Sequence, residues 1–114
     1  MSCIFCRIAA GEIPATVVAR SSGAMAFRDL SPQAPTHLLV IPIQHVTSAA
    51  HLAPGDRLPV LGEVMALAAQ VAMELGLAES GFRLVVNTGK DGGQSVDHLH
   101  VHVLGGRQMS WPPG

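Results

Sequence analysis

The most constraining stretch of this sequence is the run from His98 to Leu104, in which histidine and aliphatic residues alternate. A period of two is the period of a β-strand, so we expect a strand over Val96–Leu104. Its three imidazoles would line one face at intervals of about 6.7 Å, and Leu99, Val101 and Val103 would point into the core. Repeated polar rings on one face bring no structural gain that offsets their cost, so the run indicates a functional site.

The rest of the chain predicts further short strands and one long helix. The 114 residues suffice for one domain, which we expect to span residues 1–114. Periodicity and turn residues predict strands at Val17–Arg20, Ala24–Asp29, His37–Ile41 and Phe82–Thr88. Helical segments are expected at Cys3–Ala10 and over residues 57–75, the latter capped by Asp56 and stopped by Gly76. The predicted fold class is α+β, with an antiparallel sheet of about five strands, one long helix and one short helix.

Charge and hydropathy narrow the classes of partner. The chain has 7 Lys plus Arg and 8 Asp plus Glu, and the basic residues do not cluster, so we expect no nucleic-acid partner. No apolar run reaches the roughly 18 residues of a membrane helix. The segment Met1–Arg7 lacks the basic and apolar regions of a secretion signal. We therefore expect a cytoplasmic protein that does not bind membranes.

The long helix has a wider apolar arc than one core-facing stripe requires. Its polar residues past the first turn, Glu63, Gln70 and Glu74, lie on one face. The small residues that would let a second helix approach closely are Ala66, Ala68, Ala69 and Ala72. We interpret this second apolar face as the interface of a homodimer. The alternative is a helix wrapped by loops of its own chain.

Two kinds of chemistry fit the histidine run, because imidazole is both a metal ligand and a nucleophile at neutral pH. A catalytic metal centre would need further ligands nearby, and Asp97 is expected on the opposite face of the strand. The preceding Gly92-Gly93-Gln94-Ser95 segment offers main-chain N–H groups, an amide and a hydroxyl that suit phosphate. The combination favours a phosphoryl site, in which one imidazole attacks phosphorus.

The sequence resembles the histidine triad (HIT) superfamily, and in particular its Hint branch of purine nucleoside phosphoramidases. The resemblance rests on the alternating histidines and on motifs along nearly the whole chain. These motifs are Ile4-Phe5, Glu12-Ile13-Pro14, the segment Phe27–His37, Gly92–Ser95 and the tail Gly105–Gly114.

The resemblance implies hydrolysis of purine nucleoside 5′-phosphoramidates, such as AMP-amine or AMP-lysine conjugates, to the nucleoside monophosphate. His100 would be the nucleophile and would form a nucleotidyl-histidine intermediate. The main-chain carbonyl of His98 would hold the other nitrogen of His100, and His102 would donate to a phosphate oxygen. Ser95 would bond to the leaving group, and His37 would assist the proton balance of the nucleophile.

The resemblance also assigns substrate-binding residues. Asp29 would accept hydrogen bonds from the ribose hydroxyls, and Asn87, Gly93 and Gln94 would help to hold the phosphate. The purine would lie among apolar side chains, which are Ile4, Phe5, Ile8, Phe27, Leu30 and Leu39. Trp111 would reach the active site of the partner subunit and influence which amine is accepted.

Cys3 and Cys6 depart from many Hint proteins, but they resemble a pair that joins two histidines around a structural zinc in some bacterial members. The corresponding histidines here are His45 and His98. Two thiolates and two imidazoles would close a tetrahedral site without a position for water. We thus expect a structural zinc ion, and no cofactor for catalysis.

Two rival functions stay open at this point. The first is a dinucleoside polyphosphate hydrolase, although that branch lacks the Trp111-Pro112-Pro113-Gly114 tail. The second is a nucleotide-binding scaffold protein whose hydrolysis is incidental.

Overall fold

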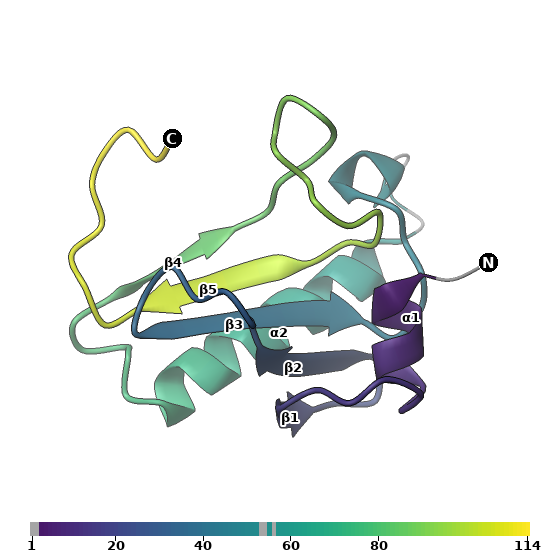
Figure 1. The fold of residues 1–114 in the computed structure, drawn as a ribbon, viewed down its shortest axis with the longest axis horizontal. Coiled ribbons are helices and arrows are strands. Elements are labelled where there is room, and N and C mark those ends of the chain that lie inside the picture. The colour runs from purple at the N-terminus through teal and green to yellow at the C-terminus, as the bar shows by residue number, and fades with distance from the viewer. Residues whose placement is uncertain (1–2, 53–54, 56) are drawn as a thin grey trace.

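The computed structural model describes residues 3–52, 55 and 57–114 and shows a five-stranded sheet with a helix across one face (Figure 1). The strands are β1 (Val17–Arg20), β2 (Ala24–Arg28), β3 (Thr36–Pro42), β4 (Phe82–Val85) and β5 (Val101–Gly105). The helices are α1 (Ile4–Ala9), α2 (Leu58–Glu74) and a short 3₁₀ turn at Ala49–Leu52. All neighbouring strands are antiparallel, in the order β1-β2-β3-β5-β4. The predicted α+β fold is confirmed.

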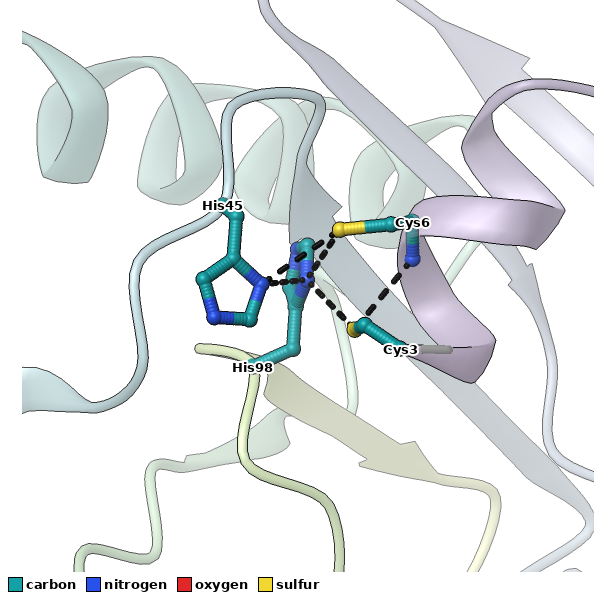
Figure 2. Close-up of side chains that lie close together, drawn as sticks. All are labelled: Cys3, Cys6, His45 and His98. Carbon is teal, nitrogen blue, oxygen red and sulfur yellow. Dashed lines mark hydrogen bonds between the residues drawn. The ribbon is translucent and has the colours of Figure 1, made fainter. Parts of the chain in front are cut away.

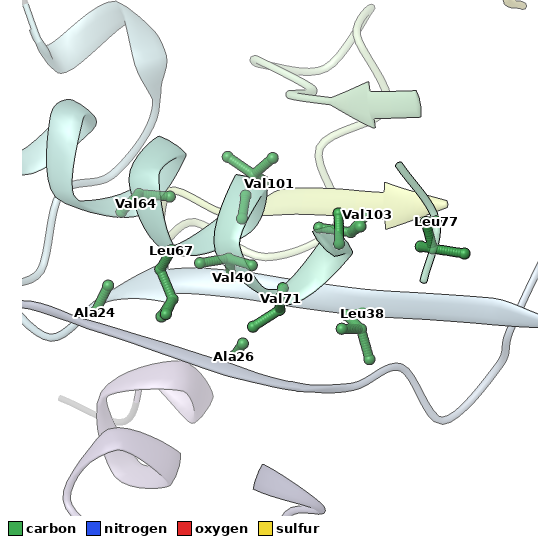
Figure 3. Packing of buried hydrophobic residues seen from close by; sticks show 12 residues of the cluster. Ala24, Ala26, Leu38, Val40, Val64, Leu67, Val71, Leu77, Val101 and Val103 are labelled. Atoms are coloured by element: carbon green, nitrogen blue, oxygen red, sulfur yellow. The ribbon is translucent and has the colours of Figure 1, made fainter. Parts of the chain in front are cut away.

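The two faces of the sheet carry different cores because side chains alternate along each strand. Leu38 and Val40 of β3 lie against α2, together with Val101 and Val103 of β5 (Figure 3). The residues between them point to the other face, where Leu39 and Ile41 pack with Phe5 and Ile8 of α1. The sheet therefore carries a larger hydrophobic cluster under α2 and a smaller one under α1.

One row of paired residues crosses the sheet on the α1 face. Phe27 of β2 pairs with Leu39 of β3, and Leu39 pairs with His102 of β5. Directly opposed residues share a face, so an aromatic ring, an aliphatic side chain and an imidazole stand side by side.

The predicted strand Val96–Leu104 is wrong in its first half, since β5 begins only at Val101. The N–H of Leu99 donates to the carbonyl of Val46 (2.6 Å) and that of His98 to Val96 (2.8 Å), so neither joins the ladder with β3. Pro42, where β3 ends, has no N–H to offer to a longer ladder. His98 and His100 therefore precede the strand, and the expected row of three imidazoles on one strand face does not form.

Strand β4 is also shorter than predicted, because residues 96–100 lie outside the sheet. The predicted strand Phe82–Thr88 ends at Val85, which pairs with His102. Residues 86–88 would have to pair with the chain before β5, and that chain has left the sheet.

The long helix is close to its predicted bounds. Arg57 occupies the N-cap position without a side-chain cap bond, and Asp56, the predicted cap, lies outside the described residues. Ala68 and Ala72, which we expected on a second apolar face, are instead fully buried against the sheet. Ala66 and Ala69 are exposed, as that prediction requires. Among the described residues, no helix combines the length and the apolar character needed to cross a membrane.

Candidate active site and adjacent metal-binding cluster

The His100 ring has a defined protonation pattern. Its Nδ1 lies 2.8 Å from the main-chain carbonyl of His98, and the residue is only 3% exposed. A carbonyl oxygen only accepts hydrogen bonds, so Nδ1 carries the proton and Nε2 of the neutral ring keeps its lone pair. This is the form in which an imidazole acts as a nucleophile.

His37 and His102 form a directional hydrogen-bond chain. The main-chain N–H of Gln33 donates to Nδ1 of His37 (3.0 Å), so the proton of neutral His37 is on Nε2. That Nε2–H lies 2.9 Å from Nδ1 of His102 and donates to it, which places the His102 proton on its own Nε2. This buried Nε2–H finds no partner within the described chain. This N–H group is therefore available to donate a hydrogen bond to an acceptor of a bound ligand.

We expected His37 to lie near His100 and to assist its proton balance. In the structure the His37 ring bonds to His102, and its assistance to His100 stays a prediction. The rings of His100 and His102 are 5.1 Å apart between centroids. A lone pair on His100 thus lies next to an unpaired donor on His102.

Burial keeps the rings of His37 and His102 neutral. Burial, followed by the neighbouring His100 and His37, lowers the pKa of His102 to about 4, against an opposing effect of Asp29. Burial also lowers the pKa of His37, against an opposing effect of Asp29, whose carboxylate lies 3.4 Å from His37 Nε2. Neutral rings are required for the donor and acceptor roles assigned above.

An apolar cavity of about 250 Å³ lies on the α1 face. No histidine is among the described residues that line it, but its Asp29 carboxylate lies 3.4 Å from Nε2 of His37. All the residues expected around a purine line it, which are Ile4, Phe5, Ile8, Phe27, Leu30 and Leu39. Asp29 and Ser95 line the same cavity. Phe5 links the cavity to His100, because its ring packs edge-on against the His100 ring with centroids 5.2 Å apart. The cavity combines an apolar wall with a few polar residues, which are Thr16, Arg28, Asp29 and Ser95, as small-molecule sites do.

The glycine-rich loop before the histidines differs from its expected role. The N–H groups of Gly93 and Gln94 donate to the carbonyls of Lys90 and Gly89. The Gln94 amide donates to the carbonyls of Thr47 and Val96 and accepts from the N–H of Gly89. Gly93 and Gln94 therefore hold the loop together, and their donors are not free for a phosphate, as we had expected.

Gly92 has a steric reason to lack a side chain, since a Cβ there would lie 2.5 Å from the carbonyl oxygen of Thr88. The loop thus folds tightly on itself and delivers Ser95 to the cavity.

Cys3, Cys6, His45 and His98 converge on one point from three segments (Figure 2). The Sγ atoms lie 3.3 to 3.5 Å from the Nδ1 atoms of the two rings, and these Nδ1 atoms are 3.1 Å apart. In a tetrahedral site with Zn–S of about 2.3 Å and Zn–N of about 2.0 Å, sulfur and nitrogen ligands stand about 3.5 Å apart. The observed spacing fits such a site.

The surroundings of this cluster also fit a metal ion. Nε2 of His98 donates to the carbonyl of Pro42 (2.9 Å), which leaves the lone pair on the Nδ1 that faces the cluster. Burial lowers the pKa of His98 and keeps its ring neutral. Burial raises the pKa of the Cys6 thiol, and adjacent Cys3 raises it further, so two thiolates side by side need a cation between them.

A second group of ligand types, Asp29, His37 and His102, has the opposite chemistry. Because the N–H of Gln33 donates to Nδ1 of His37, the proton of His37 points at the other two groups. A metal ion there would require loss of that proton. This group is therefore a hydrogen-bond chain and not a metal site.

A sequence model of the HIT domain matches residues 10–109. The chain belongs to the HIT-domain family.

Two curated relatives and one solved structure illustrate the similarity. The 14 kDa zinc-binding protein of Zea mays is 48% identical over 112 residues, which are 97% of this chain and 87% of that protein. Adenylylsulfatase HINT1 of Arabidopsis thaliana is 47% identical over 112 residues, 97% of this chain and 76% of that protein. The crystal structure of a HIT family hydrolase from Legionella pneumophila matches with a TM-score of 0.95 at 50% identity, covering 99% of this chain and 100% of that one.

Some features of this HIT site were missed from the sequence. Ile13 and Pro14 line the cavity, although we named them only within the Glu12-Ile13-Pro14 motif and gave them no role. The Gln33 N–H and the Pro42 carbonyl, which bond to the rings of His37 and His98, belong to the main chain, so no residue pattern predicts them. Conversely, Asn87 is not among the residues lining the cavity, and Trp111 is 83% exposed on its own chain.

The lowered pKa of His102 predicts a pH dependence of stability. The unfolded imidazole has a pKa of about 6.5, so between that value and about 4 the unfolded chain binds more protons than the folded one. The contribution of His102 is complete above pH 6.5 and is lost as the pH falls toward 4. We expect the unfolding free energy of the wild type to fall more steeply over this range than that of His102→Gln. Urea titrations at several pH values measure this difference, and parallel curves would contradict it.

Proposed function

We propose that this HIT protein hydrolyses purine nucleoside 5′-phosphoramidates through a covalent bond to His100. The observation that carries the proposal is the His100 Nδ1–H to His98 carbonyl bond, which leaves Nε2 as a buried nucleophile. The names of relatives are consistent with a hydrolase, since one is an adenylylsulfatase and another a HIT family hydrolase.

In the proposed reaction, Nε2 of His100 forms a bond to the α-phosphorus and the P–N bond of the substrate breaks. The electron pair of that bond leaves with the amine, which takes up a proton. Water then attacks phosphorus and the bond from phosphorus to Nε2 breaks, which releases the nucleoside monophosphate and returns the electron pair to Nε2. The proton that water loses balances the proton that the amine takes up. The Nε2–H of His102 would donate to a phosphoryl oxygen as charge builds up on it.

The cavity supports a nucleoside as the bound part of the substrate. Phe27 and Leu39 offer an apolar wall to a purine, and the Asp29 carboxylate can accept from ribose hydroxyls. Ser95, which lines the same cavity, would bond on the leaving-group side.

Replacing the nucleophile tests this function. We expect His100→Ala to lower the turnover of adenosine 5′-phosphoramidate at least about a thousandfold, because the attacking atom is gone. AMP affinity by calorimetry should change less than about threefold, since the cavity walls remain. His51→Ala removes an exposed histidine and should keep wild-type turnover.

Acid-quench mass spectrometry should locate the nucleotidyl adduct on His100. Turnover by His100→Ala close to that of the wild type, or an adduct on another residue, would contradict the assignment. Faster cleavage of diadenosine polyphosphates than of the phosphoramidate would favour the rival hydrolase.

We further propose a structural zinc ion held by Cys3, Cys6, His45 and His98, with no role in bond making. The ligand spacing, the tautomer of His98 and the paired thiols support it. A relative carries the name zinc-binding protein.

Protein purified without added metal should contain about one equivalent of zinc by elemental analysis, because the four ligands close a tetrahedral shell. Cys6→Ser should contain far less. A wild-type content well below one equivalent would refute the zinc proposal.

Finally, we propose a homodimer formed through the outer face of α2. That face is apolar and exposed at Gly62, Ala66, Ala69 and Met73, spaced so that a second helix can approach closely. Met73 is 67% exposed and extends this apolar face at the C-terminal end of α2. An exposed Trp111 is consistent with a tail that reaches a second copy.

A charge in this face should disrupt the dimer. We expect Ala69→Glu to convert a dimer into a monomer in sedimentation experiments, because the carboxylate would be buried without a partner. Ala78→Glu makes the same change at an exposed position after the helix and should leave the dimer intact. A wild-type monomer, or equal behaviour of both variants, would contradict this interface.

A further inference from the structure

The residue that connects the metal-binding cluster to the nucleophile is His98. Its Nδ1 faces the thiols of Cys3 and Cys6, and its Nε2–H donates to the carbonyl of Pro42. Its own main-chain carbonyl accepts the Nδ1–H of His100. The ring and the carbonyl belong to one residue that is fully buried, so fixing the ring also restricts the direction of the carbonyl.

The chain around His98 has few other restraints. Residues 96–100 belong to no strand, and their main-chain bonds to neighbours include Leu99 to Val46 and His98 to Val96. In a β-ladder each carbonyl direction is set by the neighbouring strand. Here the side-chain bonds of His98 must supply part of that control.

The cluster reaches His100 by a second route, through α1. This helix has six residues, too few to be stable alone. Cys3 caps it and Cys6 lies one turn later, with Phe5 between them. The Phe5 ring packs edge-on against both His98 and His100, at centroid distances of 5.8 and 5.2 Å. Anchoring the two thiols therefore also fixes the ring that packs on the nucleophile.

We propose that Cys3, Cys6 and His45 are positioning residues for His100, acting through His98 and Phe5. The inference rests on the proposed role of His100 as nucleophile and goes beyond a cluster that only stabilises the fold. Loss of a cluster ligand then releases the His98 ring on one side and lets the His100 ring sample orientations and tautomers unsuited to attack. A small misplacement of reacting groups lowers the rate of the chemical step far more than it weakens binding.

The test compares wild type with Cys6→Ser, which should lose its zinc. We expect kcat for adenosine 5′-phosphoramidate to fall about 10- to 100-fold, while AMP affinity changes less than about threefold. Nitrogen NMR of ¹⁵N-histidine-labelled protein reads the tautomer of His100 directly. In wild type it should show a protonated Nδ1 and a bare Nε2, and in Cys6→Ser a mixture of forms.

Two further variants serve as controls. Cys6→His keeps a fourth ligand and should restore zinc, kcat and the His100 spectrum to near wild-type values. Arg7→Ala changes an exposed neighbour on the same helix, whose side chain pairs with Glu12. This variant should leave zinc content and turnover unchanged.

The outcomes separate this inference from the proposed function. Zinc loss in Cys6→Ser with an unchanged kcat and an unchanged His100 spectrum would overturn the positioning role while leaving the nucleophile intact. If His100→Ala keeps full turnover, the proposed function fails, yet the His100 spectrum of Cys6→Ser still decides the coupling. Should Cys6→Ser not fold, the same spectrum and kcat are compared in wild type loaded with Zn²⁺ or with the larger Cd²⁺. Identical values for the two metals would then overturn the inference.

Discussion

The hydrogen bond from the His100 Nδ1–H to the carbonyl of His98 decides which nitrogen of the His100 ring keeps a lone pair. In water the two tautomers of imidazole exchange freely. In a buried ring the hydrogen-bond partners determine which tautomer is present. The carbonyl makes this choice without introducing a charge. The whole α1 face depends on that choice, because the cavity and the His102 donor are useful only beside a bare Nε2.

The same principle separates the two groups of metal-ligand residue types on this face of the molecule. At His98, a carbonyl on the outer side takes the ring proton, and the inner nitrogen is left as a metal ligand. At His37, a main-chain N–H occupies the outer nitrogen, and the inner one is left as a donor. Residue types alone would make both groups candidate metal sites. The main-chain partner of each ring gives them opposite chemistry.

The sequence predicted the fold well and the site in part, and the reasons can be traced to particular residues. The continuous apolar run Leu38-Leu39-Val40 reflects burial on both faces of β3, a property that side chains alone encode. The cavity wall and Cys3, Cys6, His45 and His98 as one cluster were also predicted. The free N–H groups of the glycine loop and the Gln94 amide were predicted wrongly, because a loop satisfies its own donors first when no ligand competes for them. The partner of His37 could not be predicted, since it depends on the three-dimensional placement of Gln33.

The failure of the predicted strand over residues 96–100 has a chemical reason. Had His98 and His100 continued β5, the His98 carbonyl would lie in the plane of the sheet and bond to a neighbouring strand, with side chains standing perpendicular to it. It could not then accept from the ring two residues later. The chain leaves the sheet at Val101, and this departure frees the carbonyl for His100 and turns the His98 ring toward Cys3 and Cys6. Local pattern and observed structure disagree here because the bond between the His100 ring and the His98 carbonyl needs a geometry that a regular strand does not offer.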